Sequence, residues 1–356
     1  MASFLRKVPW SSRVWKPLTF PNPDFLRIPP GERVEEELFP DYKASRYYPV
    51  IIGQVLKDRY QIVGKLCFGA SSAVWLARDL EGCRHVALKL FIHSQSMGEQ
   101  LDREVSIYRR ISNASSTHPG RGAVRELLDS FDIAGPEGSH RCLVHPPLWE
   151  NLLTFLHRNP VGRLPVPVLA FTLRRMFQAL DFLHTDCQVV HTDIKADNIM
   201  FGIEDDSVFT AFEEEELSDP SPRKTVDAVV GEVERLEDVQ PDIYRAPEVI
   251  VEAPWSYSID IWNTGCVIWD PFEGGHLFTG HDPESERYRS RAHLAEIIDL
   301  LGPPPQTLLQ TGRSSHKFFT DTGCYFATGD LRGADAGLLA GASLEEMESS
   351  LEGDSQ

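Results

Sequence analysis

The sequence predicts an α+β fold made of two lobes, a small lobe of antiparallel strands with one helix and a larger, mainly helical lobe. Short β-prone runs separated by glycines occupy residues 60–91, a pattern typical of an antiparallel meander. Apolar residues then recur at i, i+4, i+7 and i+8 between residues 169 and 183, which is the period of a helix with one buried face. With 356 residues, the chain has room for about two domains.

The composition is that of an ordinary globular protein, with 42% apolar and 25% charged residues, and it excludes a coiled coil or a wholly disordered chain. No apolar run approaches the ~18 residues of a membrane-spanning helix, so we expect no membrane partner. The 53 acidic residues outnumber the 35 basic ones, and the net charge of −18 disfavours direct nucleic-acid binding and favours basic partners. The six cysteines form no C-x-x-C pair, which predicts reduced thiols in the cytoplasm or nucleus rather than a zinc site or a disulfide framework.

Residues 1–57 are predicted to form an N-terminal extension. Its first 23 residues are basic, with no acidic residue before Asp24, and four prolines interrupt any long helix. A flexible arm is expected there, with mitochondrial targeting as the alternative. Residues 24–57 are rich in proline and charge, and they predict an extended lead-in to the first lobe.

The two lobes divide the rest of the chain. The first lobe is assigned to residues 58–147, with strands expected at 60–66, 73–77, 85–91, 130–133 and 141–144 and a helix at 98–111. The second lobe is assigned to residues 148–356 and opens with a helix after Pro165 and Pro167. Within it, residues 203–226 are strongly acidic and are expected to form an unstructured insertion. The glycine- and acid-rich end of the chain predicts that the helical lobe is incomplete.

The strongest functional signal is the string HTDIKADN at residues 191–198, directly after the predicted helix and two apolar residues. It resembles the catalytic loop of protein kinases, H-R-D-L-x-x-x-N, with its aspartate and asparagine at the required separation. The resemblance implies a bilobal protein-kinase-like fold. In that fold Asp193 receives the proton of the substrate hydroxyl, Lys195 contacts the transferred phosphate, and Asn198 binds Mg²⁺.

The string VALK at residues 86–89 is similar to the strand that carries the ATP-contacting lysine of these kinases. Lys89 is therefore the expected contact to the ATP phosphates. Glu104, within the predicted helix, is its expected ion-pair partner, and Asp102 is the competing candidate. The apolar residues that follow favour Glu104.

The phosphate-binding loop of the family is degraded in this chain. Aligned on Val74, the pattern G-x-G-x-x-G-x-V corresponds to CFGASSAV, so Gly69 is the one glycine that remains. Cys67 places a β-carbon where the family has a freely turning glycine. ATP is still expected beneath this loop, because the loop precedes the lysine strand. The ATP contacts that the resemblance implies are Leu66, Cys67, Gly69, Ser72, Val74, Ala87, Lys89 and Leu148.

Two further segments follow the order found in kinases. The string YRAPE at residues 244–248 contains the A-P-E end of an activation segment. The string SIDIWNTG at residues 258–265 resembles the start of the buried helix whose aspartate anchors the catalytic loop. Glu248 and Asp260 are therefore predicted to be structural rather than chemical residues.

The string HTDIK, with Thr192 where most kinases have arginine, is similar to the SR-protein kinases and their fungal relatives, and the segments at 148–153 and 293–302 fit the same group. The resemblance covers about residues 42–356. It implies a serine/threonine kinase that uses ATP and Mg²⁺ to phosphorylate serines in Arg/Ser-rich splicing-factor proteins. The net charge of −18 suits such a basic substrate. A monomer in the cytoplasm and nucleus is expected.

One motif of the family is missing. Asp-Phe-Gly, which supplies the metal-binding aspartate, occurs nowhere in the sequence. Counting back from Glu248 places it at a string that begins with Lys224, which cannot bind Mg²⁺, and ends with Asp227, which is a candidate. Counting forward from Asp193 reaches the acidic insertion instead, which offers carboxylates in no recognisable strand.

The second metal ligand is therefore unassigned. We expect that a segment just after Arg223 has been lost through splicing, gene-model error or decay. The alternative function is that of a catalytically impaired pseudokinase or splice product, which binds basic peptides and nucleotide without phosphoryl transfer.

Overall fold

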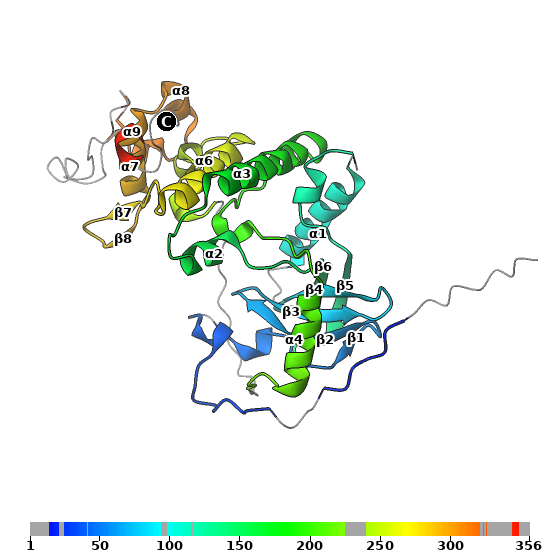
Figure 1. Ribbon diagram of the computed structural model, residues 1–356. Helices are drawn as coiled ribbons and strands as arrows, with labels where there is room; N and C mark the ends of the chain where they lie inside the picture. The colour runs from blue at the N-terminus through cyan, green and yellow to red at the C-terminus, as the bar shows by residue number, and fades with distance from the viewer. Residues whose placement is uncertain are drawn as a thin grey trace, which may run out of the picture. The chain divides into compact units, whose positions relative to one another are not determined.

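The computed structural model describes residues 14–20, 25–40, 42–93, 98–114, 117–224, 240–320, 323, 325 and 344–348. They form two compact units. The first contains the described residues of Met1–Asn113, Arg125–Trp149 and Gly202–Arg235, and the second contains those of Ala114–Val124, Glu150–Phe201 and Leu236–Gln356. The first unit is built on an antiparallel sheet and the second is mainly helical, which confirms the predicted α+β class (Figure 1).

A six-stranded antiparallel sheet forms the first unit, in the order β1-β2-β3-β4-β6-β5. Its strands are β1 (Val55–Leu56), β2 (Tyr60–Phe68), β3 (Ser72–Asp79), β4 (Arg84–Phe91), β5 (Asp129–Ala134) and β6 (Ser139–His145). Strands β2 to β4 form the meander that the glycine-punctuated sequence predicts. The strand carrying Lys89 therefore lies inside the sheet, between β3 and β6.

The register of the strands sorts their side chains between the two faces of the sheet. Val74 lies opposite Lys89, and Leu76 lies opposite Ala87. Directly opposed residues of an antiparallel pair share a face, and so do alternate residues along a strand. These four residues therefore lie on one face, here called the lysine face. The other face carries Trp75, Ala77, Val86, Leu88 and Leu90.

Helix α1 (Gly98–Asn113) follows β4 and packs on the sheet through an apolar stripe. Val105 lies in a buried cluster with Phe91 and Leu143, and Leu101 and Tyr108 flank that cluster. The spacing of residues 101, 105 and 108 is that of one face of a helix. This stripe fixes the side of α1 that meets β4.

Helix α4 (Ser207–Ser218) differs from what the sequence predicts. The sequence indicates an unstructured acidic insertion in the second lobe, whereas residues 207–218 form a helix that packs on the sheet of the first unit. The reason is an apolar stripe among the glutamates. Phe209 is buried in the sheet's core, and Val208, Phe212 and Leu217 pack around it at helical spacing. Figure 1 draws α4, in green, across the strands of the sheet.

Glu213 fixes α4 to the sheet through charge. Its Oε1 lies 2.9 Å from Arg78 Nε and 2.7 Å from His85 Nε2. Both partners lie on the lysine face, opposite each other on β3 and β4. The side chains of Arg78 and Glu213 are 10% and 12% exposed, so each charge is largely removed from water and depends on the other.

Replacing Glu213 by alanine is expected to destabilise the first unit by about 3 kcal/mol, because it leaves the charge of Arg78 buried without its partner. Hydrogen exchange of the β2–β4 amides measures this local unfolding free energy. The matched control is Glu214→Ala, since Glu214 is exposed and carries the same charge one position along the helix. Equal losses in the two variants would contradict the role assigned to Glu213.

The described part of the N-terminal extension packs on the first unit. The amide N–H of Leu18 donates to Gln61 Oε1 at 2.8 Å, and Gln61 Nε2 donates back to the carbonyl of Leu18 at 2.7 Å. Arg78 Nη1 donates to the carbonyl of Lys16 at 2.9 Å. Phe20 is buried in the core cluster of the sheet. The basic residues 1–13 lie outside the described residues, so the targeting role remains a prediction.

Helices dominate the second unit. They are α2 (Leu152–Arg158), α3 (Val166–Asp181), α5 (Pro247–Ile250), α6 (Ser258–Glu273), α7 (Ser290–Leu301), α8 (Gln306–Thr311) and α9 (Leu344–Met347), with a ribbon of β7 (His281–Asp282) and β8 (Arg287–Tyr288). Pro165 and Pro167 begin α3, where a missing N–H costs nothing. The core gathers Leu180, Ile194 and Val267 from α3, the loop after it and α6. Of the helices that the structure describes, none is long and apolar enough to span a bilayer.

Candidate active site

The first unit carries the ion pair between Lys89 and Glu104. Lys89 Nζ on β4 lies 3.1 Å from Glu104 Oε1 on α1, and the two side chains are 27% and 29% exposed. Asp102, the competing candidate, is 75% exposed and lies 3.7 Å from Arg141 instead. The structure therefore pairs Lys89 with Glu104, and it holds the ammonium group at a fixed place on the lysine face.

The loop between β2 and β3 is a short turn. Gly69 N–H donates to the carbonyl of Ser72 at 2.8 Å, which closes the turn. Cys67 stays extended within β2, opposite Val74, and its side chain is exposed. Leu66 is 40% exposed at the same end of the strand.

Tyr47, which no sequence pattern selects, holds this loop from the N-terminal extension. Its hydroxyl lies 3.2 Å from the carbonyl oxygens of both Gly69 and Ala70. No catalytic motif contains this residue, and only its position near the loop in the fold reveals its contact. The loop is thus tied to a segment that precedes the sheet in sequence.

Helix α4 shares the lysine face with the candidate nucleotide contacts. Gly64 lies opposite Leu76, and a β-carbon added to Gly64 would lie 2.6 Å from Cε1 of Phe212. Because Leu76 is itself opposite Ala87, the ring of Phe212 lies on the face that carries Lys89. Gly64 is thus required for the close approach of α4. Helix α4 therefore packs on the same face of the sheet as residues that are expected to contact ATP.

Leu148, the last of the expected ATP contacts, follows β6. It is partly buried in the short segment that connects β6 to Trp149. All the expected contacts, from Leu66 to Leu148, therefore belong to the first unit.

The second unit carries the catalytic loop, which Asp260 anchors. Asp260, at the start of α6, is completely buried. Its carboxylate accepts the backbone N–H groups of His191 at 2.7 Å and Thr192 at 2.8 Å, and it lies 2.8 Å from His184 Nε2. Thr192 has φ of 67°, a left-handed conformation that is costly for a β-branched residue. The two bonds to Asp260 hold the backbone in that conformation.

Asp193, Lys195 and Asn198, the three residues expected to take part in phosphoryl transfer, come together on this loop. Asn198 Nδ2 donates to Asp193 Oδ2 at 2.7 Å and to the carbonyl of Asp193 at 2.8 Å. Lys195 Nζ lies 3.5 Å from Asp193 Oδ1. The Asp193 side chain is 49% exposed, so the carboxylate is fixed by its neighbours and accessible to a hydroxyl group.

The metal-binding part of the site is less complete. Mg²⁺ is commonly held by one or two carboxylates together with substrate phosphates. The amide oxygen of Asn198 suits such an ion, which would also need a carboxylate ligand. Among the described residues, no three His, Cys, Asp or Glu side chains gather into a metal cluster. Lys224 bonds to Glu37 Oε2 at 2.7 Å. Asp227 lies outside the described residues, and a second metal ligand remains unassigned.

The predicted structural residue Glu248 lies in α5, where its Oε1 accepts the hydroxyl of Ser258 at 3.0 Å. Gln240, buried and with φ of 67°, fixes the same region. Its Nε2 donates to Asn263 Oδ1 at 2.7 Å, and its Oε1 accepts Ala246 N–H at 2.8 Å. None of the motifs described above contains Gln240, and the sequence indicates no such role for it.

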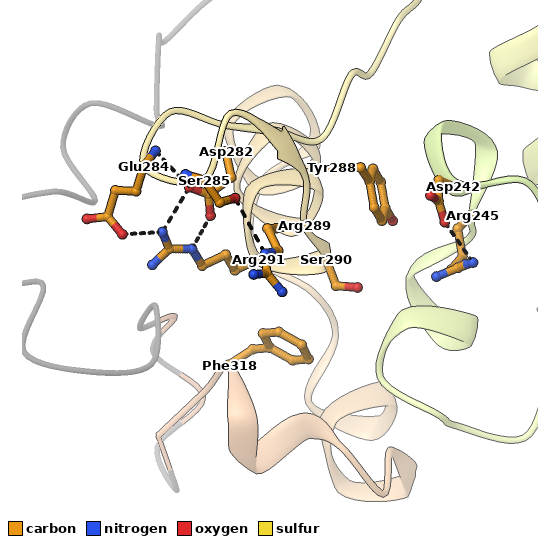
Figure 2. Close-up of a pocket in the computed structure, with 10 residues that line it drawn as sticks. All are labelled: Asp242, Arg245, Asp282, Glu284, Ser285, Tyr288, Arg289, Ser290, Arg291 and Phe318. Carbon is orange, nitrogen blue, oxygen red and sulfur yellow. Dashed lines mark hydrogen bonds and ion pairs between the residues drawn. The ribbon is translucent and has the colours of Figure 1, made fainter. Parts of the chain in front are cut away.

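A polar hollow of about 720 Å³ lies in the second unit, near the ribbon of β7 and β8 (Figure 2). Its lining residues are Asp242, Arg245, Asp282, Glu284, Ser285, Tyr288, Arg289, Ser290, Arg291 and Phe318. Arg291 is held between Asp282 and Glu284, and its guanidinium keeps the pKa of Asp282 far below the usual range. Arg245 pairs with Asp242 at 3.0 Å. The hollow is therefore a surface of mixed charge, in which the partly buried Arg245 and Arg291 are already paired with carboxylates.

His293 of α7 is expected to make the second unit sensitive to acid. It is completely buried, its Nδ1 lies 3.1 Å from the hydroxyl of Tyr288, and burial lowers its pKa to about 4. The same side chain in the unfolded chain has a pKa of about 6.5. As the pH falls, the unfolded state therefore binds a proton first, and stability is lost between pH ~6.5 and ~4, at up to about 1.4 kcal/mol per pH unit.

The measurement is the thermal unfolding midpoint at pH 7.5 and at pH 5.0, for the unmodified chain and for His293→Gln. The variant has no titrating group at this position, so its midpoint should fall less on acidification. A fall of the same size in both proteins would contradict the role of His293.

Comparison with known proteins agrees with this geometry. A protein kinase domain model matches residues 60–321. A serine/threonine protein kinase of Aspergillus fumigatus is 36% identical over all of this chain and 90% of its own length. A serine/threonine-protein kinase SRPK of Physarum polycephalum is 30% identical over 81% of this chain and 78% of its own length. SRSF protein kinase 3 of Homo sapiens is 35% identical over 53% of this chain and 33% of its own length.

Protein kinases use ATP and a divalent metal ion in general, and each unit carries residues expected for that use. The family model spans most of the chain, and the fungal and slime-mould relatives are matched over most of their length. The chain therefore belongs to the eukaryotic protein kinases, as a serine/threonine kinase of the SR-protein kinase type.

Proposed function

We propose that this chain transfers the γ-phosphoryl group of Mg-ATP to serines in Arg/Ser-rich basic proteins. The observation that carries the proposal is the anchored catalytic loop. Asp260 fixes its backbone through two N–H groups, and Asp193 is held by Lys195 and Asn198. A loop arranged in this way supplies positioning and charge, which is most of what phosphoryl transfer requires of a protein.

Each residue has a distinct part in this proposal. Asp193 accepts the proton of the substrate serine, and Lys195 neutralises charge on the phosphoryl group in transit. Lys89, oriented by Glu104, binds the ATP phosphates on the lysine face. A magnesium ion bound at Asn198 would neutralise charge between the phosphates.

The substrate class is supported by charge and by the relatives. The chain carries a net charge of −18, which favours binding of an arginine-rich partner. SRPK and SRSF protein kinase 3 carry substrate names that point to Arg/Ser-rich splicing proteins. Action on such proteins would place this chain in the cytoplasm and nucleus.

A second function, that of a peptide-binding module without phosphoryl transfer, is favoured by one specific observation. The sequence contains no Asp-Phe-Gly, and the position counted for its aspartate holds Lys224, which pairs with Glu37. Loss of a metal aspartate removes one of the larger electrostatic aids to this reaction.

Phosphate incorporation into an Arg-Ser repeat peptide by the 356-residue chain with Mg-ATP separates the two functions. The proposal expects incorporation that falls at least ~100-fold in Lys89→Met, which keeps the length of the side chain and removes the charge that binds phosphate. Peptide binding is measured in parallel by fluorescence anisotropy. A folded chain that binds the peptide and incorporates no phosphate would overturn the kinase proposal and support the binding module.

A further inference from the structure

A serine hydroxyl bonds the segment that follows α4 to a buried carboxylate of that helix. Ser221 donates its backbone N–H at 3.1 Å and its hydroxyl at 2.6 Å to Oε2 of Glu216. The other oxygen, Oε1, accepts from Arg223 Nη2 at 2.6 Å. Glu216 is 3% exposed, so these three donors compensate a negative charge that water does not reach.

The same segment holds part of the N-terminal extension, residues 25–37, here called the strap. Ile28 N–H donates to the carbonyl of Arg223, and Arg223 N–H donates to the carbonyl of Leu26, both at 2.9 Å. Lys224 Nζ lies 2.7 Å from Glu37 Oε2, and both side chains are 10% exposed. Residues 223 and 224, which follow the Ser221-Pro222 pair, therefore tie the strap to the segment after α4, while Lys65 of β2 pairs with Glu35 and Glu36 of the strap.

Ser221 is accessible although its hydroxyl is bonded. It is exposed on the rim of a hollow of about 770 Å³, which Phe25 and Phe212 also line. It is also the one serine or threonine in the sequence that a proline follows, and Lys224 stands at the third position after it. A proline-directed kinase accepts a residue without a backbone N–H directly after the serine. A lysine three positions after the serine suits an acidic groove on such a kinase.

We propose that Ser221 is the phosphorylation site of a separate, proline-directed serine/threonine kinase, and that the phosphate releases the strap from α4. In the reaction Ser221 Oγ bonds to the γ-phosphorus of ATP, ADP leaves, and the hydroxyl proton passes to the base of the modifying kinase. The inference does not depend on the chain's own catalytic activity.

The release follows from charge. The phosphate adds about −1.5 to −2 charges at the atom that now donates to Glu216, and it removes the donated proton. Two negative groups then share the single guanidinium of Arg223. Glu216 is buried on the helix, so the segment carrying Ser221 is the part that moves. Its displacement separates Arg223 and Lys224 from their partners on the strap.

The experiment treats the full chain with a purified cyclin-dependent kinase and ATP, and maps the phosphate by mass spectrometry. Incorporation is expected at Ser221 and is expected to be absent in Ser221→Ala and strongly reduced in Pro222→Ala. Glu37→Gln should speed incorporation several-fold, because it frees Lys224 for the modifying enzyme. A chain that takes up no phosphate at Ser221, in either the unmodified or the Glu37→Gln form, would overturn the proposal.

Hydrogen exchange then measures the release. The amide of Ile28 should exchange at least tenfold faster in the phosphorylated chain than in the unmodified one, since its acceptor is the carbonyl of Arg223. Amides of β3 and β4 serve as the internal control and should not change. In Glu216→Gln, phosphorylation should accelerate exchange at Ile28 much less, because the like charge is gone. Phosphorylation at Ser221 with unchanged exchange at Ile28 would contradict the release.

Discussion

Replacing Asp193 by asparagine is expected to lower phosphate transfer to an Arg-Ser repeat peptide by at least ~100-fold, while peptide affinity stays within about tenfold, or about 1.4 kcal/mol. Asparagine has nearly the same shape, so the contacts to Asn198 and Lys195 change little in geometry. An amide cannot take up the proton of the serine hydroxyl, however, so the loss is confined to the chemical step.

The measurement is steady-state phosphate incorporation with peptide binding followed by anisotropy on the same preparations. Asp186→Asn is the matched control, because Asp186 is an exposed aspartate of the same unit, outside the catalytic loop. Its transfer rate should remain within about twofold of the unmodified chain. Equal losses of transfer and binding in Asp193→Asn would refute the separation of the two roles.

The second large effect is expected at Asp260. Replacing it by alanine removes the acceptor of two backbone N–H groups and the partner of His184 at the centre of the second unit. Hydrogen bonds to a charged group contribute about 1.5–3 kcal/mol each, and buried donors left without an acceptor are costly. We expect the second unit to lose about 3 kcal/mol of stability and the transfer rate to fall ~100-fold, since Thr192 loses the bonds that hold its left-handed backbone.

Denaturant unfolding and transfer rate together test this expectation. Asp260→Asn should recover part of the stability, because one amide oxygen still accepts a backbone N–H, and less of the rate, because the loop remains loosely held. An Asp260→Ala variant with normal stability and normal transfer would show that the loop keeps its conformation without Asp260.

The parts of the site that the sequence predicts are those in which a side chain and its neighbours along the chain define the chemistry. The HTDIKADN string places Asp193, Lys195 and Asn198 on one short loop, so their meeting is dictated by local backbone geometry. The pairing of Lys89 with Glu104 is longer in range. It was predictable from the resemblance to kinases and from the apolar residues that follow Glu104.

The parts that the sequence does not predict depend on contacts between distant segments. The glutamate run of α4 suggests a solvated segment, and the stripe of Phe209 and Phe212 becomes meaningful only beside the sheet. Tyr47 and Gln240 act through a hydroxyl and an amide on backbone groups far from any motif. The second metal ligand could not be predicted either, since the motif that would supply it is absent from the sequence.

The position of α4 has a consequence for the order in which this protein can fold during synthesis. The sheet is complete in sequence at His145, but its core cluster includes Phe209, which is made about 60 residues later. At roughly 5–20 residues per second, the nascent sheet waits several seconds or more before the helix that covers it leaves the ribosome. The catalytic loop, residues 191–198, is also synthesised in that interval. The first unit is therefore finished only after part of the second has been synthesised, and its uncovered sheet is the species that a chaperone would meet.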